Sequence, residues 1–200
     1  MREEDTAMIK GDKIHLIPAT LDDRQRIYKW CFHSETTKCH SGPPDYPEIS
    51  IPTFEEFCDS DEGGYTEYYF TGEKPDDGRG FLIMNKDKAV GFISYCSFHL
   101  GAGIAELDIW IKDEANCGNG FGVDALISLG NYLNEEMGVY ELIIAPSVRN
   151  PRAIRAYEKA GFKRTDKAMS GFLLDKYVSV FGGGDYGTED TAIMVKYFEG

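Results

Sequence analysis

The sequence predicts an α/β (α+β) fold, a mixed and mostly antiparallel twisted sheet of about six to seven strands flanked by helices. Apolar residues alternate along residues 80–111 in runs separated by short turns, which indicates an antiparallel meander. Beyond residue 120 they recur at helical spacing, and helices alternate with strands. A chain of 200 residues, 42% of them hydrophobic, can bury a substantial core. We therefore expect one domain spanning residues 1–200.

The first predicted elements are a strand and a helix, followed by a long connection. Residues 13–19 alternate like a strand, and a capping box at Thr20 begins a helix that should end near His33. Residues 41–80 are rich in proline, glycine and acidic residues, so they predict a surface connection with one short helix at 53–58. The meander follows, with strands at 80–85, 89–98 and 104–111.

Helices and strands alternate in the second half of the chain. Leucines at helical spacing predict a helix that ends at Gly138, followed by a strand at 139–145. Asn150 is the predicted N-cap of a second helix, which ends at Gly161. The remaining segments are strands near 162–168 and 191–198, separated by an irregular excursion at 170–190.

Charge and composition limit the partners. The net charge of −13 argues against nucleic acid, because phosphate binding requires a basic surface. The charge is uneven, since residues 149–167 hold seven basic and two acidic residues, whereas residues 41–80 hold eleven acidic and two basic ones. The first region suits an anion and the second suits a cation. Without a run of about 18 apolar residues or a secretory signal, we expect no membrane span and a cytoplasmic location.

The five cysteines form an odd set without CxxC spacing, which favours reduced thiols over a disulfide framework. Two of them lie with two histidines in CFHSETTKCH (residues 31–40), but this spacing matches no familiar zinc pattern. We therefore expect no metal.

The segment NCGNGFGVDAL places Gly118, Gly120 and Gly122 directly before a helix. Unpaired N–H groups and the positive end of the helix dipole can hold a phosphate there, and glycine lets the backbone approach it closely. The pattern is not a P-loop, since no GK[ST] follows, and Val123 stands where a dinucleotide fingerprint has its third glycine. A flexible loop with glycines for close packing is the alternative.

A second motif, NPRAIRAYEKAGF, runs from Asn150 to Phe162, and the strand AELDIWI precedes the glycines. Together these stretches resemble the GNAT superfamily of acetyl-CoA-dependent N-acetyltransferases. Cys117, Gly120 and Gly122 stand at the positions of its pyrophosphate motif Q/R-x-x-G-x-G/A, in which Cys117 departs from Gln or Arg. The helix motif meets the pattern N-x-x-A-x-x-x-Y-x-x-x-G-F. The resemblance covers residues 104–163 and implies the GNAT fold, with a splay between the fourth and fifth strands.

The resemblance implies that acetyl-CoA is the cosubstrate and that residues 104–163 bind it. The glycine loop would hold its pyrophosphate through backbone N–H groups, and its arm would pair with the fourth strand at the splay. Arg152 or Lys159 would meet the adenosine phosphate, unless these two are solvated helix charges. The implied cofactor-binding residues are Ile109, Trp110, Ile111, Gly118, Asn119, Gly120, Phe121, Gly122, Val123, Asn150, Arg152, Ala153, Tyr157 and Lys159.

Acetyl transfer to an amine requires a base, a hydrogen-bond donor for the oxyanion and an acid for the leaving thiolate. Tyr157 suits the acid, although a tyrosine at this spacing could simply be a core aromatic. Asp108 and Glu106 share one face of their strand, and they are the first and second candidate bases, directly or through water. A solvent-exposed acidic strand face is the alternative. His99 is a third candidate, although a lone histidine at a strand end is more often solvated.

The same motifs, with the ending EDTAIMVKYF, are similar to those of aminoglycoside 6′-N-acetyltransferases, in which an aspartate matching Asp108 is implicated in acceptor binding and catalysis. The acidic, aromatic segment 41–80 lies where the superfamily commonly recognises the acceptor. We expect transfer to a primary amine of a cationic small molecule, aminoglycoside-like before polyamine, by direct attack in a ternary complex. The alternatives are N-terminal acetylation of a ribosomal or other basic protein, and a non-catalytic acyl-CoA sensor. A monomer and a homodimer both remain open.

Overall fold

An eight-stranded sheet organises the chain, with the strand order β1-β2-β3-β4-β5-β6-β8-β7. The computed structural model describes residues 8–37, 51–59 and 66–199. All neighbouring strands in it are antiparallel except β5 and β6, so the mixed, mostly antiparallel prediction is confirmed. The strands are β1 (Ile9–Lys10), β2 (His15–Pro18), β3 (Gly78–Asn85), β4 (Lys88–Cys96), β5 (Ile104–Ile111), β6 (Glu141–Ile144), β7 (Lys163–Arg164) and β8 (Met194–Tyr197).

The sheet opens into a fork between β5 and β6. These strands pair in parallel only from Ile104 to Glu106, opposite residues 141–143. Beyond that point β5 stays paired with β4, where Gly91 lies opposite Ile111, while β6 ends at Ile144. The predicted splay is therefore present, between the fourth and fifth of the strands that the sequence predicts.

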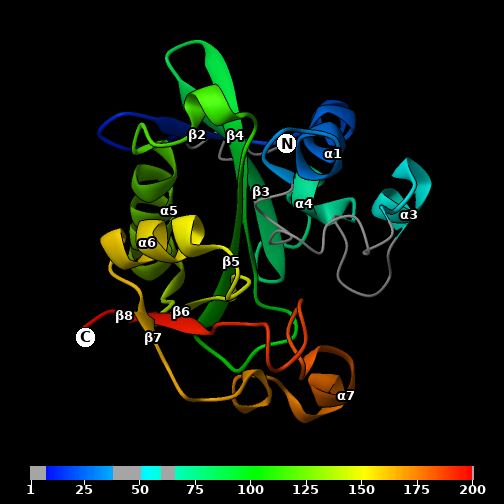
Figure 1. Ribbon diagram of the computed structural model, residues 1–200, viewed down its shortest axis with the longest axis vertical. Helices are drawn as coiled ribbons and strands as arrows, with labels where there is room; N and C mark the ends of the chain where they lie inside the picture. Colours follow the sequence, from blue (N-terminus) through cyan, green and yellow to red (C-terminus); the bar gives the residue numbers. More distant parts are fainter. Residues whose placement is uncertain (1–7, 38–50, 60–65, 200) are drawn as a thin grey trace.

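Helices cover both faces of the sheet (Figure 1). On one face lie α5 (Phe121–Met137) and α6 (Pro151–Lys159), which pack their apolar residues against β2–β6. The opposite face carries α1 (Arg24–Phe32), α3 (Phe54–Asp59) and α4 (Tyr68–Thr71) over a second core. No helix in residues 8–37, 51–59 and 66–199 is long and apolar enough to cross a bilayer.

The segment 41–80 is more than a surface connection. The predicted short helix is confirmed as α3, but Phe57, Tyr69 and Phe70 are buried beneath α1, and α4 was not predicted. Aromatic side chains interleaved with acids supply this core, so the high charge of the segment concealed its packing. Residues 41–50 and 60–65 lie outside the described residues.

The excursion 170–190 contains short helical turns that the sequence does not predict. It contains a 3₁₀ turn at Asp175–Tyr177 and the helix α7 (Val178–Phe181), and a further turn at Met169–Gly171 leads into it. Phe172 and Phe181 belong to a third apolar cluster against β6 and β8. This packing places the segment beside the fork, at the lower right of Figure 1.

Candidate active site

The glycine-rich loop before α5 has an open backbone. Gly118 and Gly120 have positive φ angles of 77° and 84°, which glycine adopts without the strain that a side chain would add. Gly120 is the N-cap of α5, so the first N–H groups of the helix have no partner within it. A Cβ atom on Gly118 would meet nothing within 4 Å. The loop therefore has the room and the donors that a pyrophosphate requires.

Asp124 fixes this loop against the turn between β1 and β2. Its carboxylate accepts hydrogen bonds from the backbone N–H groups of Asp12, Lys13 and Ile14 at 3.1, 2.6 and 3.0 Å. The Lys13 Nζ atom donates to the Asn119 carbonyl at 3.1 Å, which places a cation beside the loop. Sequence analysis missed both contacts, because they join residues far apart in the chain.

An open groove, here called the outer groove, runs along the end of β5, the glycine-rich loop and α6. Every predicted cofactor-binding residue lines it except Asn119, whose side chain turns back to the Ala115 carbonyl at 3.0 Å. The predicted lining residues are Ile109, Trp110, Ile111, Gly118, Gly120, Phe121, Gly122, Val123, Asn150, Arg152, Ala153, Tyr157 and Lys159. Those not predicted are Thr36, Asn116, Cys117, Leu126, Arg155 and Ala156.

Two of the predicted cofactor ligands have protein partners. The Asn150 Oδ1 atom accepts the Ala153 N–H at 3.1 Å and caps α6, as the sequence predicts. The Arg152 guanidinium donates twice to the Glu114 carboxylate, at 2.7 and 3.0 Å. A phosphate would have to compete with Glu114 for Arg152, whereas Lys159 lines the groove on the exposed side of α6.

A second and smaller cavity, the inner pocket, lies beyond the outer groove at the fork. Asn150, Ala153 and Tyr157 line both cavities. The two predicted strand carboxylates, Glu106 and Asp108, lie in the inner pocket, so the structure brings all three predicted catalytic residues together. The other lining residues are Tyr69, Cys96, Phe98, His99, Leu107, residues 144–147, Phe181, Asp185 and Tyr186.

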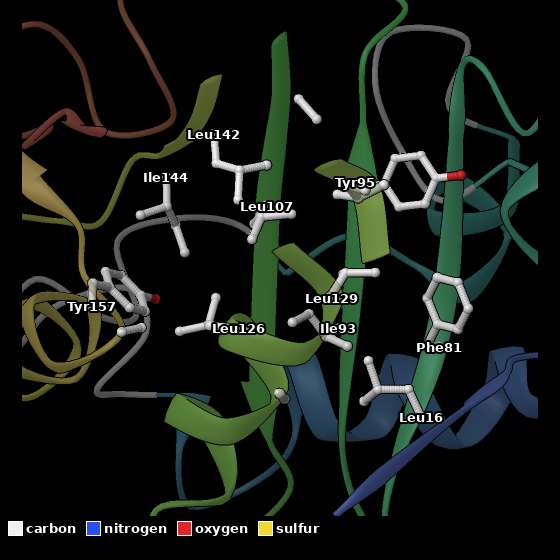
Figure 2. Packing of buried hydrophobic residues seen from close by; sticks show 14 of the residues in the cluster. Leu16, Phe81, Ile93, Tyr95, Leu107, Leu126, Leu129, Leu142, Ile144 and Tyr157 are labelled. Carbon is white, nitrogen blue, oxygen red and sulfur yellow. The ribbon is translucent and has the colours of Figure 1, made fainter. Parts of the chain in front are cut away.

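Tyr157 stands at the junction of the two cavities. Its side chain is 9% exposed and lies beside Ile144 and Leu126, with its hydroxyl directed from α6 towards β5 (Figure 2). Among the described residues the hydroxyl has no hydrogen-bond partner. Burial raises the pKa of Tyr157 well above the usual tyrosine value, and the Asp108 charge raises it further. A proton is therefore held firmly at this junction.

Asp108 lies on β5 directly after the fork. Its Oδ1 atom accepts a hydrogen bond from the backbone N–H of Ile109 at 2.9 Å. The residue is partly buried, and Ser94 of β4 lies opposite it in the sheet. The Asp108 carboxylate lies in the inner pocket. Its hydrogen-bond donor, the Ile109 N–H, belongs to a residue that lines the outer groove.

Glu106 and His99 form a pair in the inner pocket. His99 Nε2 lies 2.9 Å from Glu106 Oε2, and the Glu106 side chain is only 17% exposed. The expectation of a solvated histidine is wrong, because His99 is 4% exposed and its ring packs against Phe98 and Phe181. The alternative of a solvent-exposed acidic strand face is likewise excluded for Glu106.

Sequence analysis missed the contribution of the 170–190 segment to the inner pocket. Asp185 and Tyr186, within FGGGDYG, both line it. Burial of the carboxyl group raises the pKa of Asp185, and the charge of nearby Glu106 raises it further. The residue as a whole is still more than one third exposed. The sequence FGGGDYG has no helical or strand periodicity, so it gave no indication that Asp185 lies at this site.

Only two of the four cysteines and histidines of residues 31–40, Cys31 and His33, lie among the described residues. Cys31 is buried as a free thiol, and the residues Cys39 and His40 lie outside the described residues. A different group, Cys96, His99 and Glu106, has its ligand atoms within 4.8 Å of one another. Burial, and to a smaller extent the charge of Glu106, raises the pKa of the Cys96 thiol.

Comparisons with known proteins agree with this architecture. The aminoglycoside acetyltransferase AAC(6′)-Ib, in complex with paromomycin and acetyl-CoA, superposes with a TM-score of 0.64 at 19% identity over 93% of this chain and 94% of that chain. Spermidine N-acetyltransferase from Vibrio cholerae, in complex with CoA and spermine, gives 0.64 at 18% identity over 92% and 95%. At such identities the likeness shows the fold. No curated protein matches the sequence.

The sequence profile of the acetyltransferase (GNAT) domain matches residues 13–163. The match contains β5, the glycine-rich loop and α6, which form the outer groove. Since it covers most of the chain, the protein belongs to the GNAT acetyltransferase family.

Proposed function

We propose that this protein transfers the acetyl group of acetyl-CoA to a primary amine of a cationic small molecule, by direct attack in a ternary complex. The observation that carries the proposal is the position of Tyr157, which lines both the outer groove and the inner pocket, with Asp108 close enough to affect its ionisation. The outer groove would be the acyl-donor site and the inner pocket the amine-acceptor site, and the two adjoin at the Tyr157 hydroxyl. We take residues 1–200 to form a single domain, because one sheet includes strands from both ends of the chain.

Acetyl-CoA would supply an acyl group activated as a thioester, held in the outer groove. The N–H groups from Gly118 to Val123 would bind its pyrophosphate, since Gly118 and Gly120 leave the loop backbone accessible. The charge of Lys13, fixed beside the Asn119 carbonyl, favours an anion there. Arg152 or Lys159 would reach the adenosine phosphate.

Asp108 and Tyr157 would move the two protons of the reaction. Asp108 takes a proton from the ammonium form of the acceptor, and the resulting amine nitrogen forms a bond to the acyl carbon as the carbon–sulfur bond breaks. Tyr157 gives its proton to the departing sulfur, and the second proton that the nitrogen loses as the amide forms returns to the Tyr157 oxygen. Asp108 is preferred to Glu106 as the base, because Glu106 Oε2 is engaged by His99 Nε2.

The inner pocket favours a cationic acceptor. Three carboxylates line it, Glu106, Asp108 and Asp185, and no lysine or arginine of the described residues does. Such a pocket attracts ammonium groups and positions them by charge. The similar solved structures hold paromomycin or spermine, both carrying several amines. Both kinds of acceptor suit this charge, and the similarity of the sequence motifs to those of aminoglycoside 6′-N-acetyltransferases favours an aminoglycoside-like acceptor over a polyamine. Acetyl-CoA with a small amine is the expected substrate pair.

Thiol release from acetyl-CoA, measured with kanamycin-like compounds, spermidine and basic peptides, tests the proposal. We expect release with a small polycationic amine, and release about 100-fold slower with Asp108→Asn. Turnover with basic peptides alone would identify an N-terminal acetyltransferase of basic proteins instead. Tight acetyl-CoA binding without turnover on any amine would favour a non-catalytic acyl-CoA sensor.

A further inference from the structure

The hydrogen bond within the pair Asp108–Ile109 joins the two cavities. Ile109 lines the outer groove and Asp108 lines the inner pocket, yet Asp108 Oδ1 accepts the Ile109 N–H at 2.9 Å. A carboxylate that bonds to the N–H of the next residue must turn back along its own strand. One oxygen of the side chain is therefore hydrogen-bonded to the strand edge that borders the outer groove.

The direction of the Ile109 N–H follows from the pairing of β5. The Lys112 N–H donates to the Val90 carbonyl of β4, so even-numbered residues of β5 direct their backbone groups towards β4. Odd-numbered residues direct theirs towards the fork. Consistent with this alternation, the Ile111 carbonyl accepts the Thr36 hydroxyl, which lines the outer groove, at 2.8 Å.

The Ile109 N–H is thus a main-chain donor beyond the last β5–β6 pair, facing the opening between the strands. Pairing with β6 stops at Glu106, and β6 itself ends at Ile144. A donor at this edge is where an acyl carbonyl lying along β5 would be bound and polarised. In the structure that donor is taken by Asp108.

We propose that Asp108 is an internal competitor for the acyl-binding amide: its carboxylate occupies the Ile109 N–H in the free protein, and the thioester carbonyl displaces it into the inner pocket. This inference rests on the proposed acetyl transfer. Displacement leaves the Asp108 carboxylate without that hydrogen bond, which makes it a stronger proton acceptor for the amine. Acyl binding in one cavity would thereby prepare the base in the other.

The same movement bears on Tyr157. The Asp108 charge is the second cause, after burial, of the raised Tyr157 pKa. Once Asp108 has taken the amine proton its charge is neutralised, and this contribution to the Tyr157 pKa is lost. Tyr157 then gives up its proton more readily, at the stage when the thiolate needs it.

Affinities for acetyl-CoA and CoA, compared by calorimetry, test the competition without turnover. CoA has no acyl carbonyl, so the displaced hydrogen bond affects acetyl-CoA alone. We expect Asp108→Ala to raise the affinity for acetyl-CoA relative to CoA by about tenfold over wild type, as for one charge-assisted hydrogen bond. Removing a negative charge from the site also favours both anionic ligands, but this effect cancels in the ratio.

The matched control is Asp108→Asn, which removes the charge but keeps an oxygen that can accept the Ile109 N–H. For Asp108→Asn we expect the ratio of the acetyl-CoA affinity to the CoA affinity to lie between those of wild type and Asp108→Ala. If wild type binds CoA but Asp108→Ala leaves the ratio unchanged, the competition is refuted while the proposed function stands. If wild type binds neither ligand, the proposed function fails and the competition with it.

Discussion

His99 Nε2 lies 2.9 Å from Glu106 Oε2 inside the inner pocket, where the histidine is almost fully buried. The pair commits one oxygen of Glu106 to a structural contact. Asp108, on the same face of β5, instead accepts a hydrogen bond from the backbone N–H of Ile109, from which we propose that the acyl carbonyl displaces it. The two strand carboxylates are therefore not equivalent.

Substituting each carboxylate by its amide should separate their contributions. We expect Asp108→Asn to lower kcat by about 100-fold, the effect of losing a general base, and Glu106→Gln to lower it by less than about tenfold. Steady-state kinetics with a saturating amine gives both values. A larger loss for Glu106→Gln would make Glu106 the base, with His99 as its partner.

Tyr157→Phe should separate catalysis from binding. The ring packs against Phe162, with centroids 6.4 Å apart, and phenylalanine preserves this packing while removing the acid. We expect kcat to fall by about 100-fold with the CoA dissociation constant changed by less than about twofold. Tyr140→Phe, at a residue 52% exposed and outside both cavities, is the control. An unaltered rate in Tyr157→Phe would remove this hydroxyl from the mechanism.

The glycine-rich loop offers a matched pair of alanine substitutions. Gly120 has a φ of 84°, and a Cβ atom on it would meet the Lys13 Nζ atom at 3.0 Å. A Cβ atom on Gly122, which is within α5, would lie at an ordinary 3.6 Å from Ile109 Cδ1. We expect Gly120→Ala to weaken CoA binding by about tenfold and Gly122→Ala by less than about threefold. Equal effects on calorimetric affinity would contradict the loop geometry.

The raised Tyr157 pKa predicts a dependence of stability on alkaline pH. The folded protein holds the Tyr157 proton more tightly than the unfolded chain does. The contribution of this proton to stability is therefore complete below about pH 10 and is lost as the pH rises towards the folded pKa. We expect the free energy of unfolding to fall less in Tyr157→Phe than in wild type, by about 1.4 kcal/mol in total between pH 9 and 11. Urea denaturation between pH 9 and 11, with Tyr140→Phe as control, measures the difference; parallel slopes would contradict it.

Local patterns predicted the outer groove well, because its parts are close in sequence. The strand β5, the loop with Gly118 and Gly120, and the α6 cap at Asn150 each carry their own signal. Only α5, the turn at its end and β6 separate the loop from α6 in the sequence, so these elements lie side by side in the fold. Asn119 does not line the groove, because its side chain bonds to loop carbonyls. Its predicted backbone contact with the cofactor stays a prediction.

The inner pocket was predicted only in part, because several distant segments build it. Tyr69 comes from α4, Asp185 from the segment after α7, and His99 from the turn after β4. None of these positions has a periodic pattern that indicates a site. Phe172 and Phe181 pack the segment that precedes Asp185 on the sheet, whereas Tyr69 packs in the core beneath α1, and a single sequence does not display such tertiary contacts.

Among the described residues, only Asn150, Ala153 and Tyr157 border both cavities, so the two recognition tasks share very little of the chain. Substitutions around Asp185 would change the inner pocket without replacing any residue that lines the outer groove. Under the proposed function, the range of accepted amines would thus evolve through one peripheral segment while the donor site stays the same.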